Sequence, residues 1–144
     1  MQIQLELARQ GVITTQMAQF AEEEGFDAEL IRERVEAGEI VIPNNPNRPG
    51  QKVVGIGTRL RTKVNSSIGT SSGIYDIELE KRKARIAEAE GADTLMELST
   101  GSDLDRVRCE VLDCCQMPVG NVPLYLAFHD AARRYRNPDR LDPE

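Results

Sequence analysis

The chain has 144 residues, 40% of them hydrophobic and 29% charged, which suits one domain of ordinary size. Its net charge of −6 argues against a surface for nucleic acid or for an anionic membrane, because both partners need a basic face. No stretch approaches the roughly 20 apolar residues of a membrane-spanning helix, and the N-terminus lacks the pattern of a signal peptide, so we expect a cytoplasmic protein.

The first forty residues are predicted to be helical. One helix is expected over 16–24, opened by a threonine and closed by Gly25, because Met17, Phe20 and Ala21 recur at helical spacing. A second is expected over 28–37, since an N-cap aspartate precedes its apolar stripe and a glycine follows it.

A short strand is expected over 40–42, and the segment 43–50 contains three prolines that cannot continue it. We interpret this segment as an extended loop and the best internal boundary. The predicted organisation is therefore a helical N-terminal region with a linker over 1–50 and a second part over 51–144.

From residue 51 onwards, strand-like and helix-like segments alternate. Extended segments are expected over 53–57, 60–64, 94–98 and 118–122, with 65–73 as a loop. Helices are expected over about 76–90, 104–115 and 124–135, with Asp103 as an N-cap and the charged run 78–90 as a solvated helix face. This alternation predicts an α/β fold built from parallel βαβ units.

Three residues that close or follow the predicted strands recur every 29 residues: Ser67, Met96 and Tyr125. A repeat near thirty residues fits the first βα units of a (βα)8 barrel, and it also fits a doubly wound open sheet. The absence of a glycine-rich phosphate motif after the first strand makes a nucleotide-binding open sheet the weaker interpretation.

The last residues predict the start of a further helix, with Asp142 as N-cap and Pro143 in the first turn. Only about three βα units precede them, whereas a closed barrel needs eight. We therefore expect the chain to be the N-terminal fragment of a truncated barrel.

The predicted strand ends carry many small hydroxyl and amide side chains, which suit hydrogen bonds to a polar or phosphorylated ligand. Ordinary loop chemistry gives the same composition. Met96 also fits a core-filling role, and Tyr125 also fits an anchored ring at the edge of the core.

Three cysteines and one histidine are the remaining candidate ligands. Cys109, Cys114 and Cys115 lie on one predicted helix, where adjacent side chains point about 100° apart, so we expect buried thiols and neither a metal site nor a disulfide. His129 is expected to be a partly exposed helix residue, because a zinc site needs three or four ligands.

The sequence resembles the phosphomethylpyrimidine synthase (ThiC) family over nearly its whole length. The string GADTLMELSTG is the most specific match, supported by PVGNVPLY. The matching segments are 14–20, 40–44, 63–72, 91–101 and 118–125.

This resemblance implies a helical N-terminal region, a (βα)8 barrel and a C-terminal cysteine triplet that holds a [4Fe–4S] cluster. The family's homodimeric enzymes are radical lyases that cleave S-adenosylmethionine and convert aminoimidazole ribotide to the hydroxymethylpyrimidine phosphate of thiamine biosynthesis. The resemblance also implies a bound zinc ion. The family's ligands for the cluster and for the metal lie outside this chain. We therefore expect the isolated chain to be inactive.

Three of the family's substrate contacts are implied at Ser67, Met96 and Tyr125, and no catalytic residue or metal ligand is assigned. Ser67 stands where many members have asparagine, and its hydroxyl lacks the paired donor and acceptor of an amide. Two alternatives stay open. One is the family branch that forms 5-hydroxybenzimidazole, the lower ligand of cobalamin, and the other is a non-catalytic binding or assembly protein.

Overall fold

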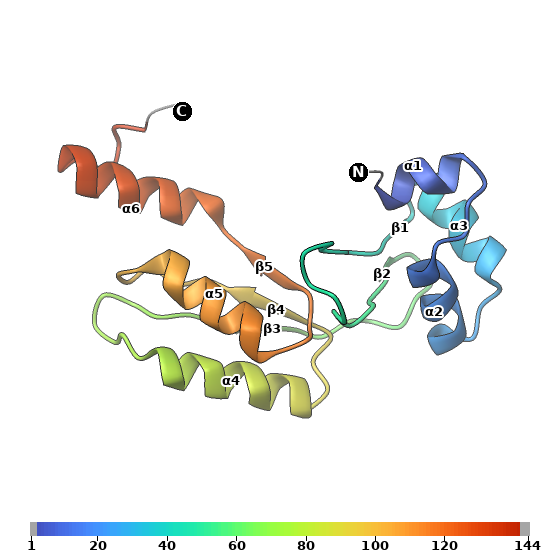
Figure 1. Cartoon of the computed structure of the whole chain (residues 1–144), viewed down its shortest axis with the longest axis horizontal. Coiled ribbons are helices and arrows are strands. Elements are labelled where there is room, and N and C mark those ends of the chain that lie inside the picture. The colour runs from blue at the N-terminus through green and yellow to red at the C-terminus, as the bar shows by residue number, and fades with distance from the viewer. Residues whose placement is uncertain (1–2, 142–144) are drawn as a thin grey trace. The chain divides into compact units, whose positions relative to one another are not determined.

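The computed structural model describes residues 3–141, so the helix start expected at Asp142 and Pro143 lies outside the described residues. The chain forms two compact units, Met1–Val64 and Asn65–Glu144 (Figure 1). The first unit extends to Val64, so it includes the segment 51–64 that was predicted to belong to the second part. Each unit is described by itself.

The first unit contains three helices and a two-stranded antiparallel sheet. They are α1 (Gln4–Arg9), α2 (Thr15–Glu24), α3 (Ala28–Glu36), β1 (Ile40–Val41) and β2 (Ile56–Gly57). The two predicted helices are confirmed with their caps. The Thr14 hydroxyl accepts the Met17 N–H at 3.2 Å, and the Asp27 carboxylate accepts the Glu29 N–H at 2.8 Å. Gly25 ends α2 in the left-handed region with φ 75°.

The apolar stripes of α2 and α3 meet β1 in one small core. Its fully buried side chains include Met17, Phe20, Ile31 and Ile40. Gly55 passes so close to Phe20 that a Cβ at this glycine would lie 2.3 Å from the ring. The stretch before β2 is thus held against α2 by direct packing.

The stretch 60–64, expected to be extended, forms no paired strand, and polar groups of Arg61 and Lys63 bond to Glu24 of α2. The Glu24 carboxylate accepts the Lys63 ammonium at 2.6 Å and the Arg61 N–H at 3.2 Å. Lys63 also lies 5.6 Å from the centre of the Phe20 ring. The side chains of Lys63 and Glu24 are only 8% and 12% exposed, so this ion pair is shielded from water.

We expect this ion pair to make the first unit sensitive to acid. The hydrogen bond from Lys63 holds the pKa of Glu24 below its ordinary value, with the Arg61 N–H acting in the same direction. A depressed carboxyl pKa gives stability that is complete above its unfolded value of about 4.3 and is lost as pH falls through the folded value. Urea midpoints measured from pH 7 to pH 3 should therefore fall less steeply for Glu24→Gln than for the parent chain. Glu22→Gln, at an exposed neighbour on α2, should keep the parent slope.

The second unit alternates strands and helices as predicted. It comprises β3 (Asn65–Ile68), α4 (Ile77–Ala89), β4 (Thr94–Glu97), α5 (Leu104–Cys114), β5 (Val119–Asn121) and α6 (Pro123–Tyr135). The three strands form one parallel sheet in the order β3-β4-β5. The loop expected over 65–73 is wrong for its first four residues, which form β3; their polar side chains concealed the strand.

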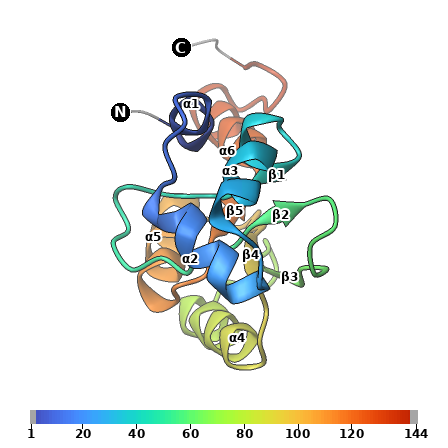
Figure 2. The same cartoon turned by 90° about the vertical axis from the view of Figure 1, so that its right-hand side faces the viewer.

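The helices α4 and α5 cover one face of this sheet. Ile68 and Leu95 point into a buried cluster with Ala84 of α4 and with Val107 and Val111 of α5. Figures 1 and 2 both show the two helices next to each other, in agreement with their direct contacts. In α6 only Ala131 is buried among the described side chains.

None of the helices within residues 3–141 is long and apolar enough to span a bilayer.

Candidate ligand-binding site at the strand ends

The face of the sheet opposite α4 and α5 carries a row of three aligned residues. Ser67 of β3 is in register with Met96 of β4, and Met96 is in register with Gly120 of β5. Ser67 is exposed and Met96 is half-buried. Glu97 points to the other face and is 5% exposed, which confirms that Met96 and Glu97 face opposite ways. The structure therefore brings two of the three predicted site residues, Ser67 and Met96, side by side.

The loops that follow β3 and β4 are bound to each other beyond the strands. The Leu98 N–H donates to the Ile68 carbonyl, and the Thr100 N–H donates to the Thr70 carbonyl, both at 2.9 Å. The Ser99 hydroxyl accepts the Thr70 N–H at 2.9 Å. These bonds extend the parallel pairing into the loops and fix the spacing of the two strand ends.

Gly69 stands at a close approach of the two loop backbones. A Cβ at this position would lie 2.7 Å from both the Leu98 carbonyl carbon and the Ser99 nitrogen. Its φ of 153° is one that side chains rarely adopt. Only glycine therefore allows the loop after β3 to contact the loop after β4 in this way.

Two buried carboxylates accept backbone N–H groups of these loops. Glu80, in the first turn of α4 and 1% exposed, accepts the Gly69 N–H at 2.7 Å and pairs with Lys83 at 2.7 Å. Glu97 accepts the Ser99 N–H at 2.8 Å. Such charge-assisted bonds to backbone N–H groups are strong. The expectation that the charged run 78–90 is simply a solvated face is therefore wrong for Glu80, which sequence reasoning missed.

The third predicted site residue lies in a different setting. Tyr125, in the first turn of α6 and 39% exposed, lines a small cavity at the ends of β4 and β5. Its other linings include Glu97, Ser99, Arg108 and Asn121. The cavity volume of about 10 Å³ accommodates about one water molecule. Tyr125 thus lies beside Glu97, on the side of β4 that Met96 does not face, and it does not belong to the row on the sheet.

The cysteines do not form a site for an iron–sulfur cluster or another metal. Cys115 is buried, Cys114 is half-buried and Cys109 is exposed, so the expectation of buried thiols is wrong for Cys109. The Cys114 thiol donates to the Val111 carbonyl within α5, and burial raises the pKa of this thiol, which disfavours the thiolate that binds metals. Within residues 3–141 no three His, Cys, Asp or Glu side chains converge on a point where a metal ion would fit. His129 is partly exposed, as expected.

Asp103 occupies the position before α5 but does not act as a conventional cap. Its backbone is left-handed with φ 50°, and its side chain makes no capping hydrogen bond in the structure. The predicted N-cap is therefore correct in position and wrong in mechanism, because the β-region backbone that aims a capping carboxylate is absent.

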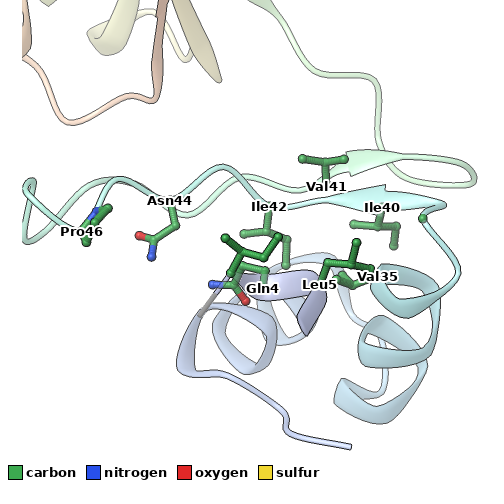
Figure 3. Close-up of a pocket in the computed structure, with 10 residues that line it drawn as sticks. Gln4, Leu5, Val35, Ile40, Val41, Ile42, Asn44 and Pro46 are labelled. Atoms are coloured by element: carbon green, nitrogen blue, oxygen red, sulfur yellow. The ribbon is translucent and has the colours of Figure 1, made fainter. Parts of the chain in front are cut away.

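The first unit contains an apolar groove of about 340 Å³ between α1 and β1 (Figure 3). Figure 3 shows Ile40 and Ile42 pointing towards the helices and Val41 pointing away from them. The described lining residues are all uncharged, with Gln4 and Asn44 among the few polar ones. Such a surface does not suit a phosphorylated ligand, so the strand ends of the second unit remain the candidate site.

The fold and the site together define a parallel α/β protein whose polar groups gather at the carboxyl ends of its strands, where such folds bind ligands. The sequence model of the radical SAM ThiC family matches residues 3–144, and the chain belongs to that family.

Two groups of curated relatives are similar to the chain. It is 63% identical over all 144 residues to the 5-hydroxybenzimidazole synthase of Desulforapulum autotrophicum and 60% identical to that of Geobacter sulfurreducens, covering 33% of each. It is 54% identical over 131 residues to phosphomethylpyrimidine synthase 1 of Methanosarcina barkeri, a match of 91% of this chain and 30% of that relative. The chain thus spans about a third of the length of these relatives.

Proposed function

We propose that this chain supplies substrate-binding strand ends to a radical S-adenosylmethionine enzyme that forms 5-hydroxybenzimidazole from aminoimidazole ribotide. The observation that carries the proposal is similarity over all 144 residues of this chain to a third of each of two 5-hydroxybenzimidazole synthases, at 63% and 60% identity. Phosphomethylpyrimidine synthase of thiamine biosynthesis, which the family resemblance alone favours, is the second candidate, supported by 54% identity over 91% of the chain.

The proposal includes a (βα)8 barrel in which β3, β4 and β5 are the first strands. Support comes from the helices α4 and α5, which pack together on one face of the sheet. A barrel places its helices on the outer face only, whereas a doubly wound sheet has helices on both faces. In such a barrel the row of Ser67, Met96 and Gly120 faces the interior, which is where the strand ends present ligand-binding groups.

The three site residues provide complementary contacts for a ribotide. The Ser67 hydroxyl both donates and accepts hydrogen bonds, which suits the ribose or phosphate oxygens. The Met96 thioether and the Tyr125 ring offer polarizable surfaces for the flat imidazole. The family's cluster and S-adenosylmethionine would supply the radical chemistry, and since Cys109, Cys114 and Cys115 do not fit a cluster, this chain's part is to bind and orient the substrate.

The proposal is tested by joining residues 1–144 to the remaining two-thirds of two relatives. One chimera carries the remainder of the Desulforapulum autotrophicum synthase, and the other carries that of the Methanosarcina barkeri synthase. After anaerobic cluster reconstitution, we expect the first to convert aminoimidazole ribotide to 5-hydroxybenzimidazole and the second to be much slower, as measured by mass spectrometry of the products.

The chain alone serves as the control and should bind aminoimidazole ribotide without converting it. If only the Methanosarcina chimera is active and yields hydroxymethylpyrimidine phosphate, the thiamine branch replaces the benzimidazole branch. If neither chimera turns over while both parent enzymes do, the chain does not provide the substrate-binding part of such an enzyme.

A further inference from the structure

We propose that Gly120 is a positioning residue that holds the Met96 thioether across β5, in the place where it contacts the substrate. This inference deepens the proposed function and rests on it. In this proposal Gly120 contacts Met96, and only Met96 contacts the substrate.

The contact between Met96 and Gly120 is unusually close. The two residues are paired in register on neighbouring parallel strands. A Cβ at Gly120 would lie 2.6 Å from the Met96 Sδ and 3.5 Å from its Cε. The thioether therefore lies directly over the bare backbone of β5, in space that any side chain at position 120 would occupy.

Backbone conformation does not explain this glycine. The glycines with positive φ are Gly11, Gly25, Gly38, Gly50, Gly69 and Gly91, and Gly120 is not among them. Alanine would thus fit the local backbone of β5 without strain. The requirement for glycine comes from the neighbouring methionine side chain.

Alanine at position 120 should move Met96 without disrupting the sheet. The obstructing atom is near the end of a flexible side chain, and methionine changes rotamer readily. Met96 is also half-buried, so its displacement costs little core packing. The displaced Met96 thioether would nevertheless take a new position relative to Ser67, the residue paired with Met96 on β3. The surface that the two side chains offer to a ligand would therefore change.

The test is a double-mutant cycle in the 144-residue chain with Gly120→Ala, Met96→Ala and the pair. Isothermal titration with aminoimidazole ribotide should show affinity about tenfold weaker for Gly120→Ala, a size typical of coupling between contacting residues. In the Met96→Ala background the same glycine substitution should have no further effect, because the residue through which it acts is gone.

A second readout does not depend on the ligand. With methyl-labelled methionine, Gly120→Ala should shift the NMR resonance of the Met96 methyl group and leave that of the buried Met17 unchanged. Gly73→Ala is the matched control for stability and for the Met96 resonance, because its added methyl group would meet open space at an ordinary φ.

Two results would overturn the inference: an unmoved Met96 methyl resonance in Gly120→Ala, or an affinity loss that persists in the Met96→Ala background. If the parent chain does not bind the ribotide, substrate binding by this chain fails as a proposal. The positioning role of Gly120 is then decided by the Met96 methyl resonance alone. A shifted resonance in Gly120→Ala supports the role, and an unshifted one refutes it.

Discussion

Gly69→Ala is expected to destabilise the second unit by about 3 kcal/mol, the upper part of the range for overpacking a tight site. The added methyl group would lie 2.7 Å from backbone atoms of Leu98 and Ser99, and backbone atoms cannot move aside as a side-chain end can. The loops after β3 and β4 would have to separate, which breaks the bond between the Thr70 N–H and the Ser99 hydroxyl. Urea unfolding followed by circular dichroism measures the loss, and amide exchange of Thr70 and Thr100 reports the separation.

Gly91→Ala separates the effect of backbone strain from the effect of the clash. Gly91 has φ 87°, but a Cβ there would meet nothing within 4 Å. We expect it to cost about 1 kcal/mol, the usual penalty for a side chain in the left-handed region. Equal losses for the two variants, with unchanged exchange at Thr70, would show that the loops do not depend on Gly69 for their close approach.

Local signals in the sequence were sufficient for much of the fold. Helices α2 and α3 were predicted with their caps because the side chains of Thr14 and Asp27 accept hydrogen bonds from N–H groups at most three residues further along the chain. The opposite orientation of Met96 and Glu97 followed from the alternation of a strand. The alternating strands and helices of the second unit followed from its apolar segments and helix-start signals, whereas Ser67, Met96 and Tyr125 were assigned as site residues only by the resemblance to the ThiC family.

The features that escaped prediction depend on partners far along the chain. β3 is polar in sequence, and only its pairing with β4 makes it a strand. The bond that holds the stretch around Lys63 also escaped prediction, because the Lys63 ammonium donates to Glu24, 39 residues earlier. Gly120 carried no sign of its role either, since its neighbour Met96 becomes visible only once the register of β4 and β5 is known.

Glu80 is the residue for which this long-range dependence has the largest expected cost. It lies in a mostly charged run, yet its carboxylate is buried and accepts the N–H of Gly69, eleven residues earlier, at 2.7 Å. Glu80→Ala removes the acceptor from this N–H, removes the partner of Lys83 and leaves a void in the packing of α4 on the sheet. We expect a loss of about 2–4 kcal/mol in unfolding free energy, since a donor that loses its partner away from water costs about 1–3 kcal/mol and the truncation of a buried side chain adds to it.

The same helix offers a matched control in Glu78. Glu78 pairs with Lys81 at the same spacing of three residues, at 2.9 Å, but its side chain is 76% exposed. Exposed pairs of this kind contribute little, so Glu78→Ala should leave the urea midpoint nearly unchanged. The two variants differ in burial and in the contact with Gly69, and amide exchange should accelerate at Gly69 in Glu80→Ala alone. Similar midpoints for both variants would mean that Glu80 is a solvated helix residue after all, and the strand end that carries Ser67 would then be held by the loops without α4.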